Sequence, residues 1–298
     1  MSRYESDGAQ LSYLDTGAAT PGEALPVVFL HPTPLDHDYW RPLLDELSAR
    51  SGAATSLRAI VPDLRGHGAS ELGGPLPTGA FQAVPDAPAL TMEQLARDIL
   101  ALLDHLGLVD AVFVGCSIGG YVMLELWRHA AQRMQGLAFI CSKPQPDAEP
   151  ALIKRAANIG IARQSGVSAL FDGMANLLIG ESSRRHRPEI VSQCRARMTL
   201  TPDAFIAVQA GLATRPDSMT TVTEITDPVL AIAGGEDTAV AAADMEAFSA
   251  APGGCAYHLI PDAGHFAAYE QPEKVADMLG LWLQQFAQPP TAITDPEK

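Results

Sequence analysis

The chain has 298 residues, of which 47% are hydrophobic and 18% are charged, a balance that excludes a disordered or fibrous protein. Lys and Arg together number 20 against 35 Asp and Glu, which gives a net charge of −15. A field of this sign repels phosphate groups, so we expect no nucleic-acid partner and no docking on anionic membranes.

Targeting signals and cysteines bear on the compartment. The N-terminal residues show no apolar run behind a basic start, and no stretch of 18 uncharged apolar residues occurs, so the sequence predicts neither a signal peptide nor a membrane span. The cysteines lie far apart without a C-x-x-C pair, at Cys116, Cys141, Cys194 and Cys255. Four cysteines allow two disulfides, but we expect reduced thiols in a cytoplasmic protein.

Strands and helices alternate through the first half of the chain. The turn signal Asp7-Gly8 divides residues 3–16 into a predicted hairpin. Short apolar runs predict strands at 26–31, 57–64, 111–115 and 136–142, and helical spacing predicts helices at 39–50, 91–106 and 118–133. Thr91 and Gln94 have the spacing of a capping box, and the Gly- and Pro-rich segment 65–90 is expected to form a long loop.

The pattern changes after residue 143. Up to residue 226 the sequence predicts only amphipathic helices, at 150–164, 167–179, 188–198 and 202–214. Alternation then returns, with strands expected at 228–233 and 256–260, helices at 241–250 and 272–286, and a frayed polar tail from Ala287. We therefore expect an α/β core formed by residues 1–143 and 227–298, a parallel sheet covered on both faces, with a helical cap at 144–226.

A serine motif marks the expected site. Gly115-Cys-Ser117-Ile-Gly119-Gly120 lies directly between a predicted strand and a predicted helix, which is the context that G-x-S-x-G requires. The glycines let the chain turn sharply and leave the serine hydroxyl exposed at the carboxyl edge of the sheet, where ligands bind in open α/β sheets. Ser117 is therefore the candidate nucleophile.

A serine hydroxyl needs a base, and the base needs an orienting acid. Of eight histidines, His265 lies in a loop directly after the last predicted strand, where an imidazole could face Ser117. Glu236 and Asp237 follow the preceding strand, and both are candidates for the acid.

The oxyanion of an acyl-transfer intermediate needs two N–H donors. The amide of Ile118 follows the nucleophile and is one candidate. The second should come from the loop after the strand at 26–31, where Pro32 and Pro34 have no N–H, so Thr33 is the nearest donor.

At these residues the chain resembles the α/β-hydrolase superfamily. The resemblance rests on Asp63-Leu-Arg-Gly-His-Gly68, the serine motif, Gly234-Gly-Glu-Asp237, and Gly264-His265 with Glu270 behind. It implies an eight-stranded, mostly parallel sheet with a helical cap. It also implies the acid of a G-x-x-D motif, hence Asp237, although some relatives carry the acid after an earlier strand, where Asp147 could serve.

Within the superfamily the chain most resembles 3-oxoadipate enol-lactonases and carboxylesterases, with haloperoxidase-like esterases as close relatives. This resemblance implies a serine nucleophile, no cofactor and no metal. Two positions depart from the family pattern, because His31-Pro32 stands where His-Gly is usual and Cys116 stands where His often precedes the nucleophile. Relatives often have a cis proline in this loop, so we expect a cis Thr33–Pro34 bond.

The sequence therefore predicts a serine hydrolase that cleaves a small-molecule carboxylic ester or lactone. Two alternatives remain open: the same triad acting in carbon–carbon bond hydrolysis or perhydrolysis, and a hydrolase fold that binds a ligand without turning it over. The natural substrate and the oligomeric state, a homodimer included, are not encoded in any pattern we recognise.

Overall fold

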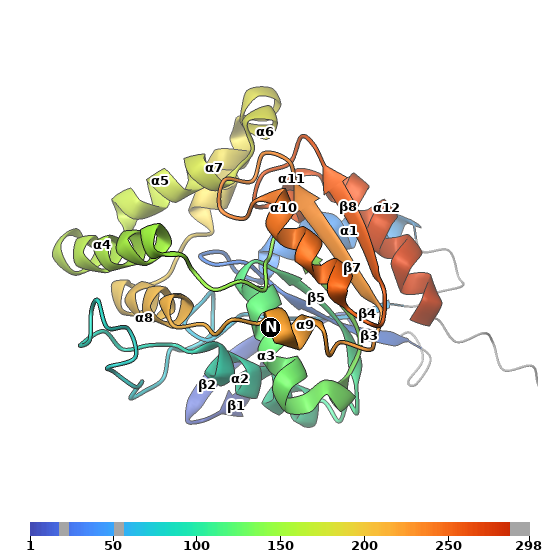
Figure 1. The fold of residues 1–298 in the computed structure, drawn as a ribbon, viewed down its shortest axis with the longest axis horizontal. Coiled ribbons are helices and arrows are strands. Elements are labelled where there is room, and N and C mark those ends of the chain that lie inside the picture. Colours follow the sequence, from blue (N-terminus) through green and yellow to red (C-terminus); the bar gives the residue numbers. More distant parts are fainter. Residues whose placement is uncertain (18–23, 51–56, 287–298) are drawn as a thin grey trace, which may run out of the picture.

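The computed structural model describes residues 1–17, 24–50 and 57–286. One eight-stranded sheet runs through the molecule, and a group of helices lies beyond one end of it (Figure 1). The predicted C-terminal tail from Ala287 lies outside the described residues.

The sheet contains every predicted strand, in the order β1-β2-β4-β3-β5-β6-β7-β8. The first two strands form the predicted hairpin, and β2 pairs antiparallel with β4, whereas all pairs from β4 through β8 are parallel. The strands are β1 Ser2–Ser6, β2 Ala9–Asp15, β3 Leu25–Leu30, β4 Leu57–Pro62, β5 Ala111–Cys116, β6 Met134–Ile140, β7 Val229–Gly234 and β8 Cys255–Ile260.

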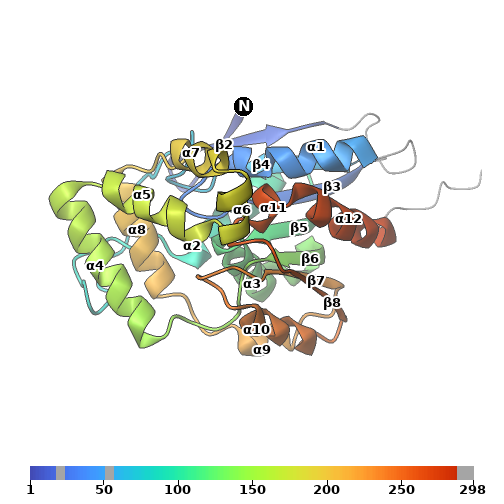
Figure 2. The ribbon, with the colours of Figure 1, turned by 90° about the horizontal axis from the view of Figure 1, so that it is seen from above.

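Burial explains why these runs form strands. Every residue of β5 and β7 is buried, as expected where helices cover both faces of a parallel sheet and leave no polar side to the strand. The helices of the core are α1 Arg41–Arg50, α2 Met92–His105, α3 Ile118–Ala130, α10 Ala242–Met245, α11 Ala267–Glu270 and α12 Pro272–Leu283. Figure 2 shows α1 beside α12 along one face of the sheet and α2 with α3 on the other.

The cap segment forms helices only, as the sequence predicts. Between β6 and β7 lie α4 Glu149–Ser165, α5 Ser168–Leu178, α6 Glu181–His186, α7 Glu189–Ala196, α8 Pro202–Ala213 and α9 Met219–Val222. The long loop before α2 meets this group, because the amide of Leu90 donates to the carbonyl of Ala207 in α8. Among the described residues, no helix combines the length and the apolar character needed to cross a bilayer.

Three short helices are absent from the sequence prediction, and each lacks the signal on which that prediction relies. The six residues of α6 are mostly charged or polar, with only Ser183 buried. The helices α9 and α11 span four residues each, about one helical turn, which is too short for a hydrophobic spacing to repeat. The expected capping box is half formed. Thr91 accepts from the amide of Gln94, but the Gln94 side chain donates to Asp7 and Asp98 instead of returning to the cap.

Candidate active site

Ser117 occupies a strained turn between β5 and α3. Its backbone has φ 53° and ψ −115°, in the positive-φ region that non-glycine residues rarely adopt. Such a conformation costs about 1–3 kcal/mol and persists only where the surroundings enforce it. Here the enforcing bonds are those from the Ser117 amide to the carbonyl of Ile140 and from the Gly120 amide back to the carbonyl of Ser117.

The three glycines around the serine are required by close contacts. A Cβ on Gly119 would fall onto the carbonyl of Leu30 at the end of β3. One on Gly120 would overlap the side chain of Ser142, and one on Gly115 would overlap Met123 and the backbone at Gly119. The turn is thus wedged against the neighbouring strands, which explains in steric terms why G-x-S-x-G-G occurs here.

The structure brings the three predicted side chains together. His265 follows β8 and Asp237 follows β7, and the imidazole lies between them, with Nε2 2.9 Å from Ser117 Oγ and Nδ1 2.8 Å from Asp237 Oδ2. A carboxylate only accepts hydrogen bonds, so Nδ1 carries the proton and Nε2 is free to accept from the serine hydroxyl. Ser117 is 8% exposed and His265 4%, so the chain of bonds is largely shielded from water.

The acid is held independently of the histidine. The second oxygen of Asp237 accepts from the amides of Ala239 and Val240, at 2.7 and 3.0 Å. Because these donors lie in its own loop, the carboxylate keeps its direction whether or not the histidine is charged.

Glu236, the neighbouring candidate acid, points elsewhere. Its two oxygens accept from the hydroxyl and the amide of Ser182 in the cap, at 2.6 and 2.7 Å. The Thr238 hydroxyl in the same loop donates to the carbonyl of Leu177. Glu236 therefore ties the cap to the core and does not contact His265.

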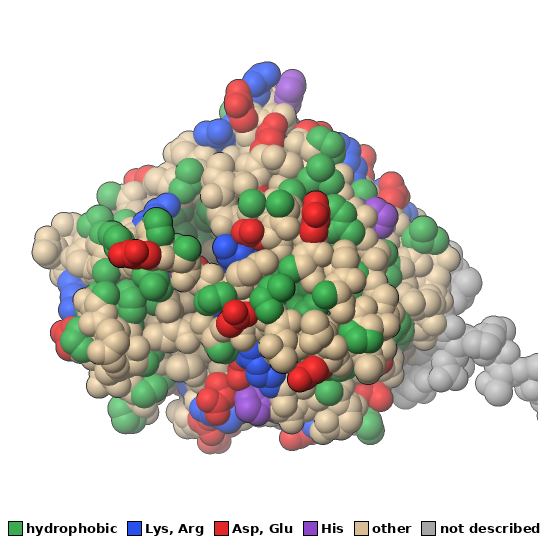
Figure 3. All heavy atoms as spheres, viewed as in Figure 1, with side chains coloured by type: hydrophobic (Ala, Val, Ile, Leu, Met, Phe, Trp, Pro, Cys, Tyr) green, Lys and Arg blue, Asp and Glu red, His purple; other side chains and the backbone are tan. Residues whose placement is uncertain are grey.

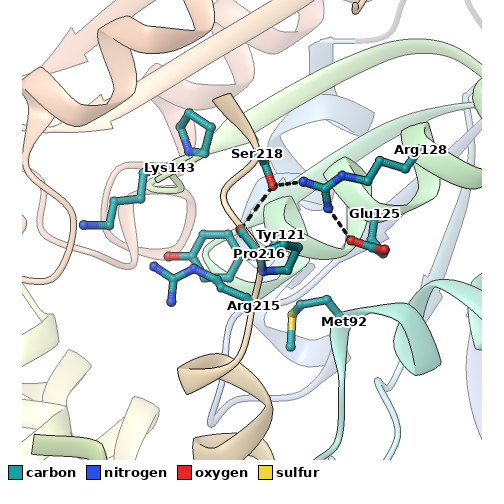
Figure 4. A pocket seen from close by; sticks show the side chains of 9 residues that line it. Met92, Tyr121, Glu125, Arg128, Lys143, Arg215, Pro216 and Ser218 are labelled. Carbon is teal, nitrogen blue, oxygen red and sulfur yellow. Dashed lines mark hydrogen bonds and ion pairs between the residues drawn. The ribbon is translucent and has the colours of Figure 1, made fainter. Parts of the chain in front are cut away.

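Asp147, the third candidate acid, forms ion pairs with two arginines. Its carboxylate pairs with Arg155 and, at 2.7 Å, with Arg215, whose guanidinium lies 4.4 Å from the ring centre of Tyr121. Figure 4 shows Arg215 over Tyr121 in a small surface pocket, with Arg128 and Ser218 on the other side. Asp147 therefore does not orient the histidine.

The two candidate oxyanion donors lie on neighbouring elements, with Ile118 at the start of α3 and Thr33 in the loop after β3. Gly119, the residue after Ile118, is packed against the end of β3, and the loop that begins there contains Thr33. Within the described part of the chain, neither backbone N–H has a hydrogen-bond acceptor, so both remain available to a ligand. The Thr33–Pro34 peptide is cis, as expected.

Two buried histidines support the loop that contains Thr33, and one of them binds the Thr33 side chain. The Nδ1 of His67 lies 3.0 Å from the carbonyl of Arg65, and its Nε2 lies 2.9 Å from Thr33 Oγ1, so the threonine hydroxyl donates to a neutral ring. His31 is arranged alike, with Nδ1 against the carbonyl of Pro32 and Nε2 accepting from Leu64. Burial lowers the pKa of His31 to about 4 and that of His67 to about 3, so both act as fixed neutral groups.

Cys116 precedes the candidate nucleophile in the sequence but is not accessible to solvent. It is fully buried and accepts a hydrogen bond of 3.3 Å from the hydroxyl of Tyr39. Burial raises the pKa of its thiol well above the ordinary value, and a neutral thiol is a weak nucleophile. Among the described residues, no cluster of three or more His, Cys, Asp or Glu side chains has an arrangement suited to a metal ion.

A serine in a strand–turn–helix elbow, bonded to a histidine and an acid that follow later strands, defines the class of α/β hydrolases. The sequence matches the alpha/beta hydrolase family over residues 27–278, and the chain belongs to this family.

Individual relatives cover much of the chain. It is 24% identical over 254 residues to 3-oxoadipate enol-lactonase 1 of Acinetobacter baylyi, covering 85% of this chain and 86% of the relative. It is 34% identical to a non-heme haloperoxidase of Rhodococcus erythropolis, but over 140 residues, 47% of this chain and 43% of that protein.

Solved structures show the same fold. A thermophilic esterase from Thermogutta terrifontis superposes with a TM-score of 0.83 at 30% identity, covering 97% of this chain and all of that one. The enol-lactonase from Burkholderia xenovorans LB400 superposes with a TM-score of 0.80 at 24% identity, over 95% of this chain and all of that one.

Proposed function

We propose that this α/β hydrolase cleaves a carboxylic ester or a lactone through an acyl-enzyme on Ser117. The observation that carries the proposal is the unbroken chain of hydrogen bonds from Ser117 Oγ through the His265 imidazole to Asp237, at 2.9 and 2.8 Å. The relatives named as esterase and enol-lactonase support an oxygen-ester substrate.

In the proposed acylation, Ser117 Oγ attacks the substrate carbonyl while its proton passes to His265 Nε2. Asp237 stabilises the resulting imidazolium and keeps the proton on Nδ1 in place. The amides of Thr33 and Ile118 donate to the oxyanion. His265 then returns its proton to the leaving alkoxide, which departs as an alcohol, or stays attached to the acyl group where the substrate is a lactone.

In the proposed deacylation, His265 accepts a proton from water while the water oxygen attacks the acyl-enzyme carbonyl. Collapse of the second tetrahedral intermediate releases the carboxylic acid and restores the Ser117 hydroxyl. The overall reaction consumes one water for each ester bond broken, and no residue changes its covalent state after one turnover.

The test is the turnover of p-nitrophenyl esters by Ser117→Ala. The substitution removes the nucleophile but leaves the elbow, so we expect kcat/KM to fall by about 10⁴-fold while the protein stays folded. Turnover within a fewfold of the wild type would refute the proposal. A panel of acyl chain lengths and of lactones, run in parallel, identifies the preferred bond.

A further inference from the structure

Glu270 is a buried carboxylate outside the proposed triad. It is the last residue of α11, its exposure is 0%, and it lies five positions after the histidine. Its Oε2 accepts from the amides of Gly180 and Gly264, at 2.9 and 3.1 Å, and its Oε1 accepts from the amide of Phe266 at 3.2 Å. All three donors are backbone groups.

These donors surround the catalytic loop. Gly264 and Phe266 are the residues on either side of His265, so the carboxylate fixes the backbone before and after the imidazole. Gly180 lies in the cap, between α5 and α6. The amide of His265 itself donates to the carbonyl of Leu178 at 2.8 Å, which ties the histidine to the same cap segment.

The two chain segments meet too closely for a side chain to separate them. A Cβ on Gly180 would lie 2.7 Å from the amide nitrogen of Gly264. The two glycines bring two N–H groups to one carboxylate oxygen. The cap segment and the histidine loop thus share one carboxylate oxygen as acceptor, in addition to the direct bond from the His265 amide to the Leu178 carbonyl.

Within the parts of the chain that the structure describes, the Glu270 carboxylate has no ionic partner. Among the described residues, no Lys, Arg or His pairs with Glu270, and Arg187 donates to its backbone carbonyl instead. Burial raises its pKa, while hydrogen bonds from the Gly264 amide, the Ser183 side chain and the amides of Gly180 and Phe266 act against this shift. A charge buried without a counter-ion is costly, and here backbone N–H groups, together with the nearby Ser183 hydroxyl, offset that cost.

We propose that Glu270 is a positioning residue, which holds the His265 loop against the cap so that the imidazole reaches both Ser117 and Asp237. The proposal rests on the proposed role of His265. It differs from a purely structural role because the effect of losing Glu270 should appear in the geometry of the imidazole. Small displacements of a catalytic group, of the order of 1 Å, lower rates by about a hundredfold.

Glu236 provides the matched control. It is also a glutamate that anchors the cap to the core, through Ser182, yet its side chain makes no bond to the histidine loop. The Glu236 carboxylate also lies beside Gly180, but Glu236→Gln removes no hydrogen bond to the residues on either side of His265 and changes only the attachment of the cap. Glu270→Gln keeps the shape of the side chain but replaces one carboxylate oxygen with an NH₂ group. This donor then faces at least one of the backbone N–H groups, which are donors themselves.

The experiment compares Glu270→Gln, Glu270→Ala and Glu236→Gln with the wild type in steady-state kinetics and in ¹H NMR of ¹⁵N-histidine protein. The NMR signal of interest is the Nδ1 proton between His265 and Asp237, assigned by its absence in His265→Ala. We expect kcat to fall about tenfold in Glu270→Gln and about a hundredfold in Glu270→Ala, with KM changed by less than about threefold. We also expect the Nδ1 signal to be lost or shifted.

Glu236→Gln should keep both kcat and the signal. The proposal is overturned if Glu270→Gln also keeps the wild-type kcat and the Nδ1 signal. It is overturned as well if kcat falls equally in Glu236→Gln, because the loss would then come from a weaker attachment of the cap. If Glu270→Ala does not fold, the two glutamine variants carry the comparison. If the wild type hydrolyses no ester or lactone, the proposed function fails, but the Nδ1 signal still decides whether Glu270 positions His265.

Discussion

The backbone around Ser117 is held by hydrogen bonds and by close steric contacts with the neighbouring strands. The serine adopts a backbone conformation that its side chain disfavours, and the turn is held by the neighbouring strands. Gly119 is the point of closest approach, because its Cα faces the carbonyl of Leu30 directly. A rigid backbone carbonyl cannot move aside as a flexible side chain can, so even one methyl group should not fit.

We therefore predict that Gly119→Ala lowers stability by about 3 kcal/mol or more and removes most of the proposed hydrolytic activity, because overpacking against backbone forces the elbow to shift. Gly160, in the middle of α4, has open space at its Cβ position and is the matched control. Gly160→Ala should raise stability by roughly 0.5–1 kcal/mol through helix propensity. Denaturant unfolding of both variants provides the measurement. Equal stability of the two would contradict the steric account.

The residues of the proposed site differ in how well the sequence predicts which other residues they will contact. Ser117, His265 and Asp237 each follow a predicted strand, and the carboxyl ends of parallel strands meet at one edge, so their candidacy could be argued from the pattern. Glu270 and Glu236 could not be assigned to their partners. The bonds of Glu270 to Gly180 and of Glu236 to Ser182 cross 90 and 54 positions, and no local pattern records which cap residue will face them.

At the scale of elements, the loops after β3 and β4 are joined by one carboxylate. Asp63 Oδ1 accepts from the amide and from Nδ1 of His37, each at 2.8 Å, and its Oδ2 accepts from the amide of Ala69. The first loop contains Thr33, so this junction supports the proposed oxyanion donor. The hydrogen bond to Asp63 raises the pKa of His37, and the nearby Asp36 and Asp38 act in the same direction.

The raised pKa of His37 predicts the direction in which its contribution to stability changes with pH. A histidine whose folded pKa exceeds its unfolded value of about 6.5 stabilises the fold fully below that value and loses the contribution as the pH rises through the folded pKa. His37→Gln should therefore cost roughly 1 kcal/mol of stability at low pH and progressively less at alkaline pH. Unfolding in urea at pH 6, 7.5 and 9 measures this trend. A stability difference that grows with pH would contradict it, and His258→Gln on β8 serves as the control.

Most elements could be predicted because their hydrophobic pattern is determined by the layer in which they lie. The fully buried β5 and β7 appear as continuous apolar runs, and α2 appears as one apolar stripe with a threonine cap. The exceptions are informative. The four residues of α11 are all buried, so no polar face alternates with an apolar one, and the helix cannot be recognised from spacing.

At the scale of the whole molecule, the sheet order explains how distant segments converge. β5 lies between β3 and β6, so the serine elbow is flanked by the Thr33 loop on one side and by Ser142 on the other. β7 and β8 follow, and their loops contribute Asp237 and His265. The sequence predicts the alternation but not this order, because the order depends on long-range strand pairing.

The visible face of the molecule has no large patch of a single charge sign. On the face shown in Figure 3, acidic and basic side chains are interspersed, and hydrophobic side chains are scattered, with several over the cap helices at the left.

In the described part of the chain, a buried ion pair between Arg65 and Asp98, each 2% exposed, fixes the start of the long loop to α2. The end of the same loop meets the cap, because the Leu90 amide donates to the carbonyl of Ala207 in α8.

The most direct test of the central claim is covalent labelling with phenylmethylsulfonyl fluoride, followed by intact-mass and peptide mass spectrometry. The account predicts a single adduct, located on Ser117, that is absent in Ser117→Ala and forms far more slowly in His265→Ala. An unlabelled wild type, or an adduct that persists when Ser117 is replaced, would contradict the assignment of the nucleophile, and labelling of His265→Ala at the wild-type rate would show that the histidine does not activate this serine.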